Sequence, residues 1–198
     1  MTTIDLMRHG EVTPGLCLGS TYDPPLTNVG WSQMRGVLAW VQPPWDGVVS
    51  SPLIRCASFA EELAEHYGLP LRLEPRLREL GFGAWEGRSW SDLYRHEGEK
   101  LLEFQRSPRF NPAPGGEDYQ DFEARVTDFW RDLLQHSHGE HWLVVTHAGV
   151  IRSILRIVLG FPEQRLFSLH VPHAGLTRIH QKGEDFTQAR LVFHGGRL

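Results

Sequence analysis

Two histidines stand in the same place relative to two apolar segments of the chain. His9 follows "IDLM" and Arg8, whereas His147 follows "WLVVT", and each is followed within two residues by a glycine. An imidazole ring titrates near neutral pH and can act as a nucleophile or a general base. Because an open α/β sheet places its ligand crevice at the carboxyl ends of its strands, this pattern predicts that His9 and His147 meet at one site.

Two arginines follow apolar segments in the same way. Arg8 directly precedes His9, and Arg55 lies in the first turn of a helix predicted after "GVVSS". A guanidinium group stays charged and binds phosphate oxygens through two parallel hydrogen bonds. Two arginines beside two histidines therefore predict a pocket for a phosphoryl group that needs no metal ion.

The segment "LRELGFGAWEG" adds two carboxylates, Glu79 and Glu86, among glycines and aromatic residues. A general acid works best with a pKa near ambient pH, and apolar surroundings raise the pKa of a carboxyl group toward that value. Glu79 is our first candidate for such an acid. The alternative is that both glutamates are ordinary loop charges and that Phe82, Trp85 and Trp90 pack the core.

The cluster "HSHGEH" could suggest a metal site. It contains His136, His138 and His141, but it falls in a predicted exposed loop without a matching carboxylate or cysteine pattern. Cys17 and Cys56 have no CxxC spacing, which favours two inert thiols. We expect neither a metal nor another cofactor.

The segments that must position these residues alternate between strand and helix patterns. Strands are predicted at 3–7, 46–51, 71–75 and 142–147, helices from Thr27 to about Val41, from 56 to 67, near 90–96 and 100–105, from "PGGE" past Leu133 and at 150–159, and a terminal hairpin in "GLTRIH" and "FTQARLVFH". Such alternation predicts an α/β fold, a three-layer α/β/α sandwich whose central sheet is mostly parallel and ends in a C-terminal antiparallel hairpin.

Composition narrows the class of protein. The chain has 198 residues, 40% hydrophobic and 22% charged, which predicts one domain over residues 1–198. Its formal net charge of −4 argues against nucleic acid or an anionic membrane as a partner. No signal peptide or apolar run of about 18 residues is evident, so we expect a cytoplasmic protein.

Six segments, taken together and in order, resemble the histidine phosphatase superfamily, which includes the cofactor-dependent phosphoglycerate mutases. They are "LMRHGE", "PLTNVGWSQ", "SSPLIRCASFAE", "LRELGFGAWEG", "PGGEDYQDFEARV" and "VVTHAGVIR". The resemblance implies a phosphoglycerate mutase-like fold and metal-independent hydrolysis of a phosphomonoester. It also implies that His9 becomes phosphorylated, that Arg8, Arg55 and a protonated His147 hold the phosphoryl group, and that Glu79 donates the proton.

The chain departs from the family pattern at three positions. Gly15 stands where many members have an asparagine that contacts phosphate, so one ligand of the phosphate is absent here. Cys56 and Phe59 replace residues that are often alanine and threonine. These differences leave the reacting group intact.

Two loops, "PGLCLGSTYDPPLT" and "GFGAWEG", look most like those of alpha-ribazole phosphatases, which remove a 5′-phosphate during cobalamin assembly. A benzimidazole-bearing substrate would suit aromatic walls, for which the candidates are Tyr22, Phe82, Trp85 and Trp90. Ser20 and Thr21 are candidate hydroxyl contacts, and Arg152 is interpreted as a surface or structural charge. Three alternatives stay open: a broad-specificity phosphatase, a phosphoglycerate mutase and a non-catalytic phosphate-binding scaffold. Whether the chain forms a homodimer is also left open.

Overall fold

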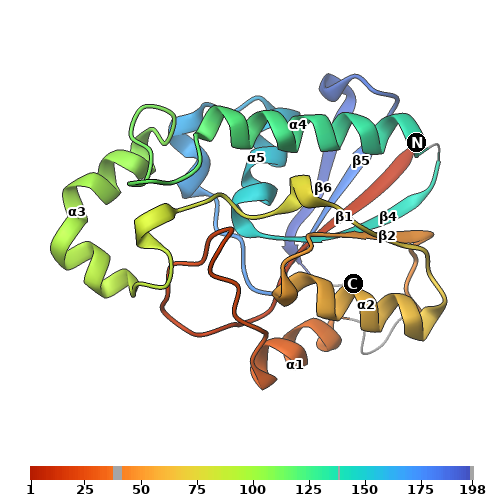
Figure 1. Ribbon diagram of the computed structural model, residues 1–198. Coiled ribbons are helices and arrows are strands. Elements are labelled where there is room, and N and C mark those ends of the chain that lie inside the picture. The colour runs from red at the N-terminus through yellow and green to blue at the C-terminus, as the bar shows by residue number, and fades with distance from the viewer. Residues whose placement is uncertain (38–41, 138, 197–198) are drawn as a thin grey trace.

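The computed structural model describes residues 1–37, 42–137 and 139–196, and its strands form one six-stranded sheet in the order β3-β2-β4-β1-β5-β6 (Figure 1). The strands are β1 (Thr2–Arg8), β2 (Gly47–Ser50), β3 (Leu71–Leu73), β4 (His141–Thr146), β5 (Leu176–Gln181) and β6 (Ala189–Gly196). The first four strands of this order run parallel, whereas β5 is antiparallel to β1 and β6 is antiparallel to β5. The predicted parallel sheet with an antiparallel C-terminal hairpin is confirmed.

Helices cover both faces of this sheet. The α-helices are α1 (Asn28–Gly36), α2 (Ile54–Tyr67), α3 (Trp90–Arg106), α4 (Tyr119–His136) and α5 (Ala148–Leu159), and the short 3₁₀ helices are η1 (Pro75–Leu77), η2 (Gly83–Trp85), η3 (Glu163–Ser168) and η4 (Phe186–Gln188). Figure 1 shows α4 and α5 on one face of the sheet, α1 and α2 on the other, and α3 projecting beyond one end of it. The predicted three layers are therefore present.

The apolar strand segments are explained by burial on both faces. Leu6 and Val144 belong to the core that contains residues of α4 and α5, whereas their neighbours Met7 and Val145 belong to the core beneath α1 and α2. Side chains alternate across a strand, so a strand covered on both faces needs apolar residues at consecutive positions. This burial fixes the positions of the strand ends.

Several predicted helix ends are found where expected. The Thr27 hydroxyl accepts a hydrogen bond from the Gly30 N–H at 3.0 Å and so caps α1. Gly68 and Gly160 end α2 and α5 in the left-handed conformation that glycine favours, with φ of 65° and 68°. The predicted end of the first helix, near Val41, lies outside the described residues.

The two short helices predicted near 90–96 and 100–105 are halves of one helix, α3. They meet at Glu97, whose φ of −137° and ψ of 25° interrupt the helical geometry. The Glu97 carboxylate accepts a hydrogen bond from the Trp85 indole at 3.1 Å and pairs with Arg88. These contacts connect the middle of α3 to η2 and to the loop that follows η2, which the spacing of apolar residues alone does not reveal.

Among the described residues, no helix is both long enough and apolar enough to cross a lipid bilayer.

Candidate active site

The carboxyl ends of β1, β2 and β4 bring the predicted site residues together. In the register of the sheet, Arg8 lies opposite Thr146 and Ser50 lies opposite Val145, so the residues that follow these strands share one edge. The rings of His9 and His147 are 5.3 Å apart between centroids and are inclined at 62°. The predicted convergence of the two histidines is thus present in the structure.

His9 is held as a neutral imidazole, and its second nitrogen forms no hydrogen bond with the described part of the chain. Its Nδ1 lies 2.8 Å from the Gly10 carbonyl oxygen, so Nδ1 carries the proton and donates it to that oxygen. Burial, together with the charges of Arg8 and Arg55, holds the pKa of His9 well below its usual 6.5. The unprotonated Nε2 therefore has a lone pair available for attack.

His147 is completely buried behind His9. Its Nε2 lies 2.8 Å from the Ser51 hydroxyl, and the Cys56 sulfur lies 3.7 Å from the same nitrogen. Burial, followed by the charges of Arg55 and His9, holds the pKa of His147 well below its usual range. In the site without substrate, burial and the positive groups around His147 therefore disfavour its protonated form, and the expectation of a protonated His147 in the substrate complex stays a prediction.

Arg8 and Arg55 are fixed mainly by carbonyl oxygens. Arg8 Nη1 donates to the Val171 carbonyl at 2.6 Å, and Arg55 Nη2 donates to the Gly19 carbonyl at 2.7 Å. Arg55 Nη1 also donates to Asp23 at 3.0 Å. The buried Nε–H groups of Arg8 and Arg55 have no partner among the described residues. Burial lowers the pKa of Arg8 to about 10, so this guanidinium is still charged at neutral pH. Two charged groups with unmet donors favour an anion between them.

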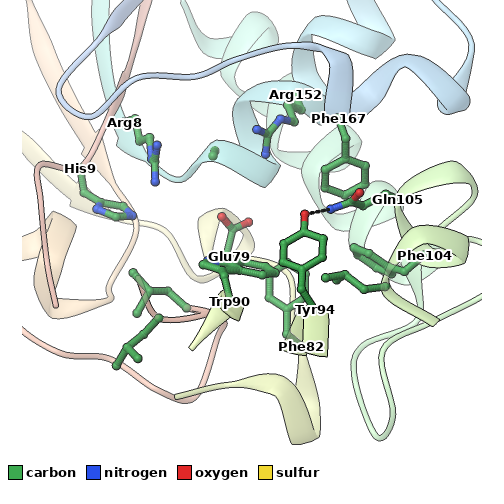
Figure 2. Close-up of a pocket in the computed structure, with 14 residues that line it drawn as sticks. Arg8, His9, Glu79, Phe82, Trp90, Tyr94, Phe104, Gln105, Arg152 and Phe167 are labelled. Atoms are coloured by element: carbon green, nitrogen blue, oxygen red, sulfur yellow. Dashed lines mark hydrogen bonds between the residues drawn. The ribbon is translucent and has the colours of Figure 1, made fainter. Parts of the chain in front are cut away.

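Glu79 is aimed into the same site (Figure 2). Glu79 is only 7% exposed, and its two side-chain oxygens accept hydrogen bonds from the backbone N–H groups of Leu80 at 2.9 Å and Gly149 at 3.1 Å. Gly149 lies in the first turn of α5, so one of the two donors is an N–H group at the start of a helix that has no partner within the helix itself. The sequence expectation of apolar surroundings missed these two polar contacts.

Ser20, Thr21 and Tyr22, the predicted substrate contacts from the loop after β1, bind Glu86 through their backbone. Glu86 accepts hydrogen bonds from the N–H groups of Ser20, Thr21, Tyr22 and Phe82, and from the Thr21 hydroxyl. Burial raises the pKa of Glu86, but the bonds from Thr21, Tyr22 and Phe82 outweigh it and lower the pKa below its usual value. Ser20, Thr21 and Tyr22 are not among the residues that line the pocket beside His9. The structure gives them the role of holding this loop.

The pocket beside His9 has a volume of about 500 Å³ and a largely aromatic far wall. Its lining residues are Arg8, His9, Leu16, Leu18, Glu79, Phe82, Trp90, Tyr94, Leu101, Phe104, Gln105, Ala148, Arg152 and Phe167. Two of the predicted aromatic residues, Phe82 and Trp90, are in this set. Trp85 is not, because it is 99% buried in the core and its indole donates to Glu97.

Sequence reasoning missed several neighbours of the reacting group. Tyr94, Phe104 and Gln105 come from α3, whose apolar spacing could have indicated a pocket wall once its position was known. Phe167 comes from η3 and His173, whose ring centroid is 5.9 Å from that of His9, from the following loop. No local sequence pattern marks Phe167 or His173 as a neighbour of the site. Arg152, interpreted as a surface or structural charge, lines the pocket.

The other expectations concern the histidine cluster and the departures from the family pattern. His136 contacts Asp132, whereas His141 Nε2 lies 2.9 Å from Asp5, and His138 lies outside the described residues. Within those residues, no group of three histidine, cysteine or acidic side chains could hold a metal ion.

At the positions that depart from the family pattern, Cys56 is buried, which raises the pKa of its thiol, and Phe59 packs in the core beneath α2. Gly15 has a φ of 78°, so it suits the turn rather than a ligand.

Comparisons with known proteins agree with this geometry. The model of the histidine phosphatase superfamily (branch 1) matches residues 4–193. A Hydrogenobacter thermophilus protein with the provisional name phosphoserine phosphatase 2 is 34% identical, with 94% of this chain and 93% of the relative covered. An Escherichia coli adenosylcobalamin/alpha-ribazole phosphatase is 30% identical, with 84% and 83% covered. A solved mycobacterial glucosyl-3-phosphoglycerate phosphatase superimposes with a TM-score of 0.84 at 25% identity, covering 99% of both chains.

The fold and the site define an α/β phosphomonoester hydrolase with a histidine at its centre. The chain belongs to the histidine phosphatase superfamily, branch 1, and is a phosphatase of that superfamily. The expectation of a phosphoglycerate mutase-like α/β fold is confirmed.

Proposed function

We propose that this phosphatase hydrolyses a small-molecule phosphomonoester through a phosphohistidine formed on His9, without a metal ion. The observation that carries this proposal is a neutral, buried imidazole with a free Nε2, beside two arginines whose Nε–H groups are unpaired among the described residues. A nucleophile next to an anion-binding pair is what in-line phosphoryl transfer requires.

In the first step, the Nε2 lone pair of His9 attacks phosphorus and the bond from phosphorus to the ester oxygen breaks. Glu79 gives its proton to the departing oxygen, which leaves as an alcohol. Arg8, Arg55 and His147 stabilise the negative charge on the other phosphoryl oxygens. Because a bound phosphate supplies the opposite charge that His147 lacks, substrate binding raises the pKa of His147 and favours its protonated form.

In the second step, water attacks the phosphohistidine. The bond between phosphorus and Nε2 breaks, its electron pair returns to His9, and the Glu79 carboxylate takes a proton from the water. Inorganic phosphate leaves and the starting state is restored. One carboxylate placed on the leaving-group side of the pocket can serve both steps.

For the substrate we propose alpha-ribazole 5′-phosphate, as the loop resemblance suggests. The aromatic wall formed by Phe82, Trp90, Tyr94, Phe104 and Phe167 supports a leaving group with a flat apolar ring. The alpha-ribazole phosphatase relative from E. coli supports the same choice. Esters with an acidic leaving group are a second candidate, favoured by the position of Arg152, which is argued below.

The test is turnover of a panel of esters together with trapping of the phosphoenzyme. The panel contains alpha-ribazole 5′-phosphate, phosphoserine, 3-phosphoglycerate and 4-nitrophenyl phosphate. We expect hydrolysis with the highest kcat/KM for the ribazole ester, unchanged in EDTA, and an acid-labile phosphoenzyme. Equal rates for all esters would contradict the substrate assignment, and loss of activity in EDTA with rescue by a divalent ion would contradict the mechanism.

A matched pair of variants checks the nucleophile. His9→Ala should abolish both turnover and the phosphoenzyme, whereas His66→Ala, which removes an exposed histidine of α2, should change neither. A fully active His9→Ala enzyme would exclude the phosphohistidine mechanism.

A further inference from the structure

Arg152 lies near Glu79 beside the reacting group and, among the described residues, forms no ion pair. It lies in α5, its Nε donates to the Leu169 carbonyl at 3.0 Å, and its guanidinium lies over the Phe167 ring, 5.4 Å from the centroid. Within the described residues, neither Nη nitrogen forms a hydrogen bond and no carboxylate lies within ion-pair distance. Its side chain lines the pocket. The two Nη groups are therefore the free, charged end of a well-anchored side chain.

Apart from Arg8, which lies in the phosphoryl site, the other partly buried arginines of the described residues pair with carboxylates. Arg156 pairs with Glu123, Arg109 with Glu123 and Glu163, and Arg178 with Asp5. A cation held partly away from bulk water without a partner is unfavourable, and an anionic ligand would supply the missing partner. The exception at Arg152 occurs at the wall of the active-site pocket.

The direction of the reaction places the leaving group near Arg152. In-line attack by His9 expels the ester oxygen on the side of phosphorus opposite to His9. In Figure 2, Glu79 lies between His9 and Arg152, and Phe167 lies next to Arg152. The part of the substrate beyond the oxygen that Glu79 protonates therefore extends toward Arg152.

We propose that Arg152 forms a subsite for a second oxyanion, carried by the leaving group of the substrate. This inference rests on the proposed function, because it takes Glu79 to mark the leaving-group side, and it favours the second substrate candidate, because alpha-ribazole carries no second anionic group. The anion is a carboxylate or a second phosphate, both of which accept two hydrogen bonds from the free Nη groups of one guanidinium. Phosphomonoesters with an acidic leaving group are then preferred over neutral esters of the same shape.

The first arm of the test measures binding without turnover, in the His9→Ala background. 3-Phosphoglycerate and glycerol 3-phosphate differ at one carbon, which is a carboxylate in the first and a hydroxymethyl group in the second. Adenosine 3′,5′-bisphosphate and adenosine 5′-phosphate form the matching pair for a second phosphate. In at least one pair, calorimetry should give a Kd lower by about tenfold or more for the member with two anionic groups. This is the size expected of charge-assisted hydrogen bonds. The pair that shows the difference identifies the kind of anion.

The second arm changes the arginine. Arg152→Gln should remove most of the Kd difference within the pair that responds. It should change the Kd of the member with one anionic group by no more than about twofold. Arg152→Lys should keep part of the difference, because the charge remains. Arg131→Gln, which changes an exposed arginine of α4, should leave the difference intact. Equal Kd values within both pairs for the Arg152-containing protein would overturn the subsite, and so would a preference that survives in Arg152→Gln.

Failure of the proposed function would look different. If the chain with His9 intact hydrolysed none of the esters and formed no phosphoenzyme, the proposed function would fail while the Kd difference could still stand. If hydrolysis and the phosphoenzyme were present but the Kd values within each pair were equal, only the Arg152 subsite would fail.

Discussion

The carboxylate of Glu79 and the backbone of Gly149 fit against each other with no space between them. The Gly149 N–H donates to Glu79 Oε2 at 3.1 Å, and a Cβ atom at position 149 would lie 2.2 Å from Glu79 Oε1. Any larger residue there must displace the carboxylate. The glycine that follows the second histidine motif thus determines where the acid lies.

Gly149→Ala should move Glu79 and slow turnover without unfolding the protein. We expect kcat/KM to fall about 100-fold, because a shift of about 1 Å in a catalytic group has effects of this size. Steady-state kinetics measure this fall. As a control, Gly36→Ala places its methyl group in open space at the end of α1 and should leave kcat/KM unchanged. An unaffected Gly149→Ala enzyme would show that Glu79 does not need this position.

Glu86 should influence activity through the loop and Arg55. The two Glu86 oxygens accept hydrogen bonds from different N–H groups, whereas a glutamine side chain has only one acceptor oxygen. Glu86→Gln therefore leaves one set of N–H groups without an acceptor. The loop it holds supplies the Gly19 and Tyr22 carbonyls that fix Arg55. We expect about a tenfold weaker Kd for inorganic phosphate, measured by calorimetry. Glu61→Gln, an exposed change in α2, is the control. Unchanged phosphate affinity in Glu86→Gln would separate the loop from the phosphate site.

His9 should remain neutral well below the pH at which a free histidine takes up a proton. Burial and the neighbouring arginines depress its pKa, so nitrogen NMR should show no protonation of its ring from about pH 7.5 down to about pH 6. The spectrum of His9→Gln identifies its signal. In the unfolded chain the same histidine does take up a proton near pH 6.5, so the stability linked to His9 is full above that pH and decreases below it. An imidazolium signal for His9 at neutral pH would contradict this prediction.

Ser51 should position His147. Its hydroxyl lies 2.8 Å from His147 Nε2, and Ser51→Ala leaves that buried nitrogen without this partner. We expect kcat to fall about tenfold or more in Ser51→Ala. Ser51→Thr should lose less of kcat, because threonine keeps the hydroxyl group. The matched control is Ser153→Ala, since the Ser153 hydroxyl is also buried but has no partner among the described residues. If both alanine variants were equally active, the hydrogen bond to His147 would not matter for turnover.

Asp5 should stabilise the sheet far from the site. The fully buried carboxylate accepts hydrogen bonds from Trp45 and Arg178, and His141 lies within hydrogen-bond distance. Burial raises the pKa of Asp5, but the bonds from Arg178, His141 and Trp45 outweigh it and lower the pKa below its usual 3.8. Asp5→Asn should reduce the free energy of unfolding by about 1.5–3 kcal/mol at neutral pH, measured with denaturant.

The pH dependence of this effect has a definite sign. Because the folded state keeps Asp5 ionised where the unfolded chain begins to bind a proton, its stabilisation is present above about pH 3.8 and is lost as the pH falls below it. The difference between Asp5→Asn and the parent should therefore shrink in acid. Asp128→Asn, an exposed change in α4, should show no such difference at any pH. A gap that grows on acidification would contradict the assignment.

The strands and their ends could be predicted from the sequence, because buried strands must be apolar at consecutive positions and are followed by distinctive residues. His9, His147 and Arg55 were placed together on that basis, and the register of the sheet agrees. The far wall of the pocket could not be predicted in this way. Phe104, Arg152 and Phe167 come from three helices whose packing depends on contacts distant in the chain.

The roles of polar loop residues were also beyond sequence reasoning. Thr21 looks equally suited to a substrate contact and to a bond with a carboxylate, and only its distance from Glu86 decides between them. The same holds for Trp85, whose indole meets Glu97 because α3 is kinked there. Polarity indicates that a partner exists and leaves the identity of that partner to the fold.

The place of β1 in the sheet has a consequence for how the protein is made. This strand carries Arg8 and His9 at its end, yet it pairs only with β4 and β5, as the contacts of Thr3 with His141 and His180 show. During synthesis the segment with the reactive histidine leaves the ribosome long before the strands that flank it. The nucleophile therefore gains its geometry, and its depressed pKa, only after β5, which ends at Gln181, has been translated.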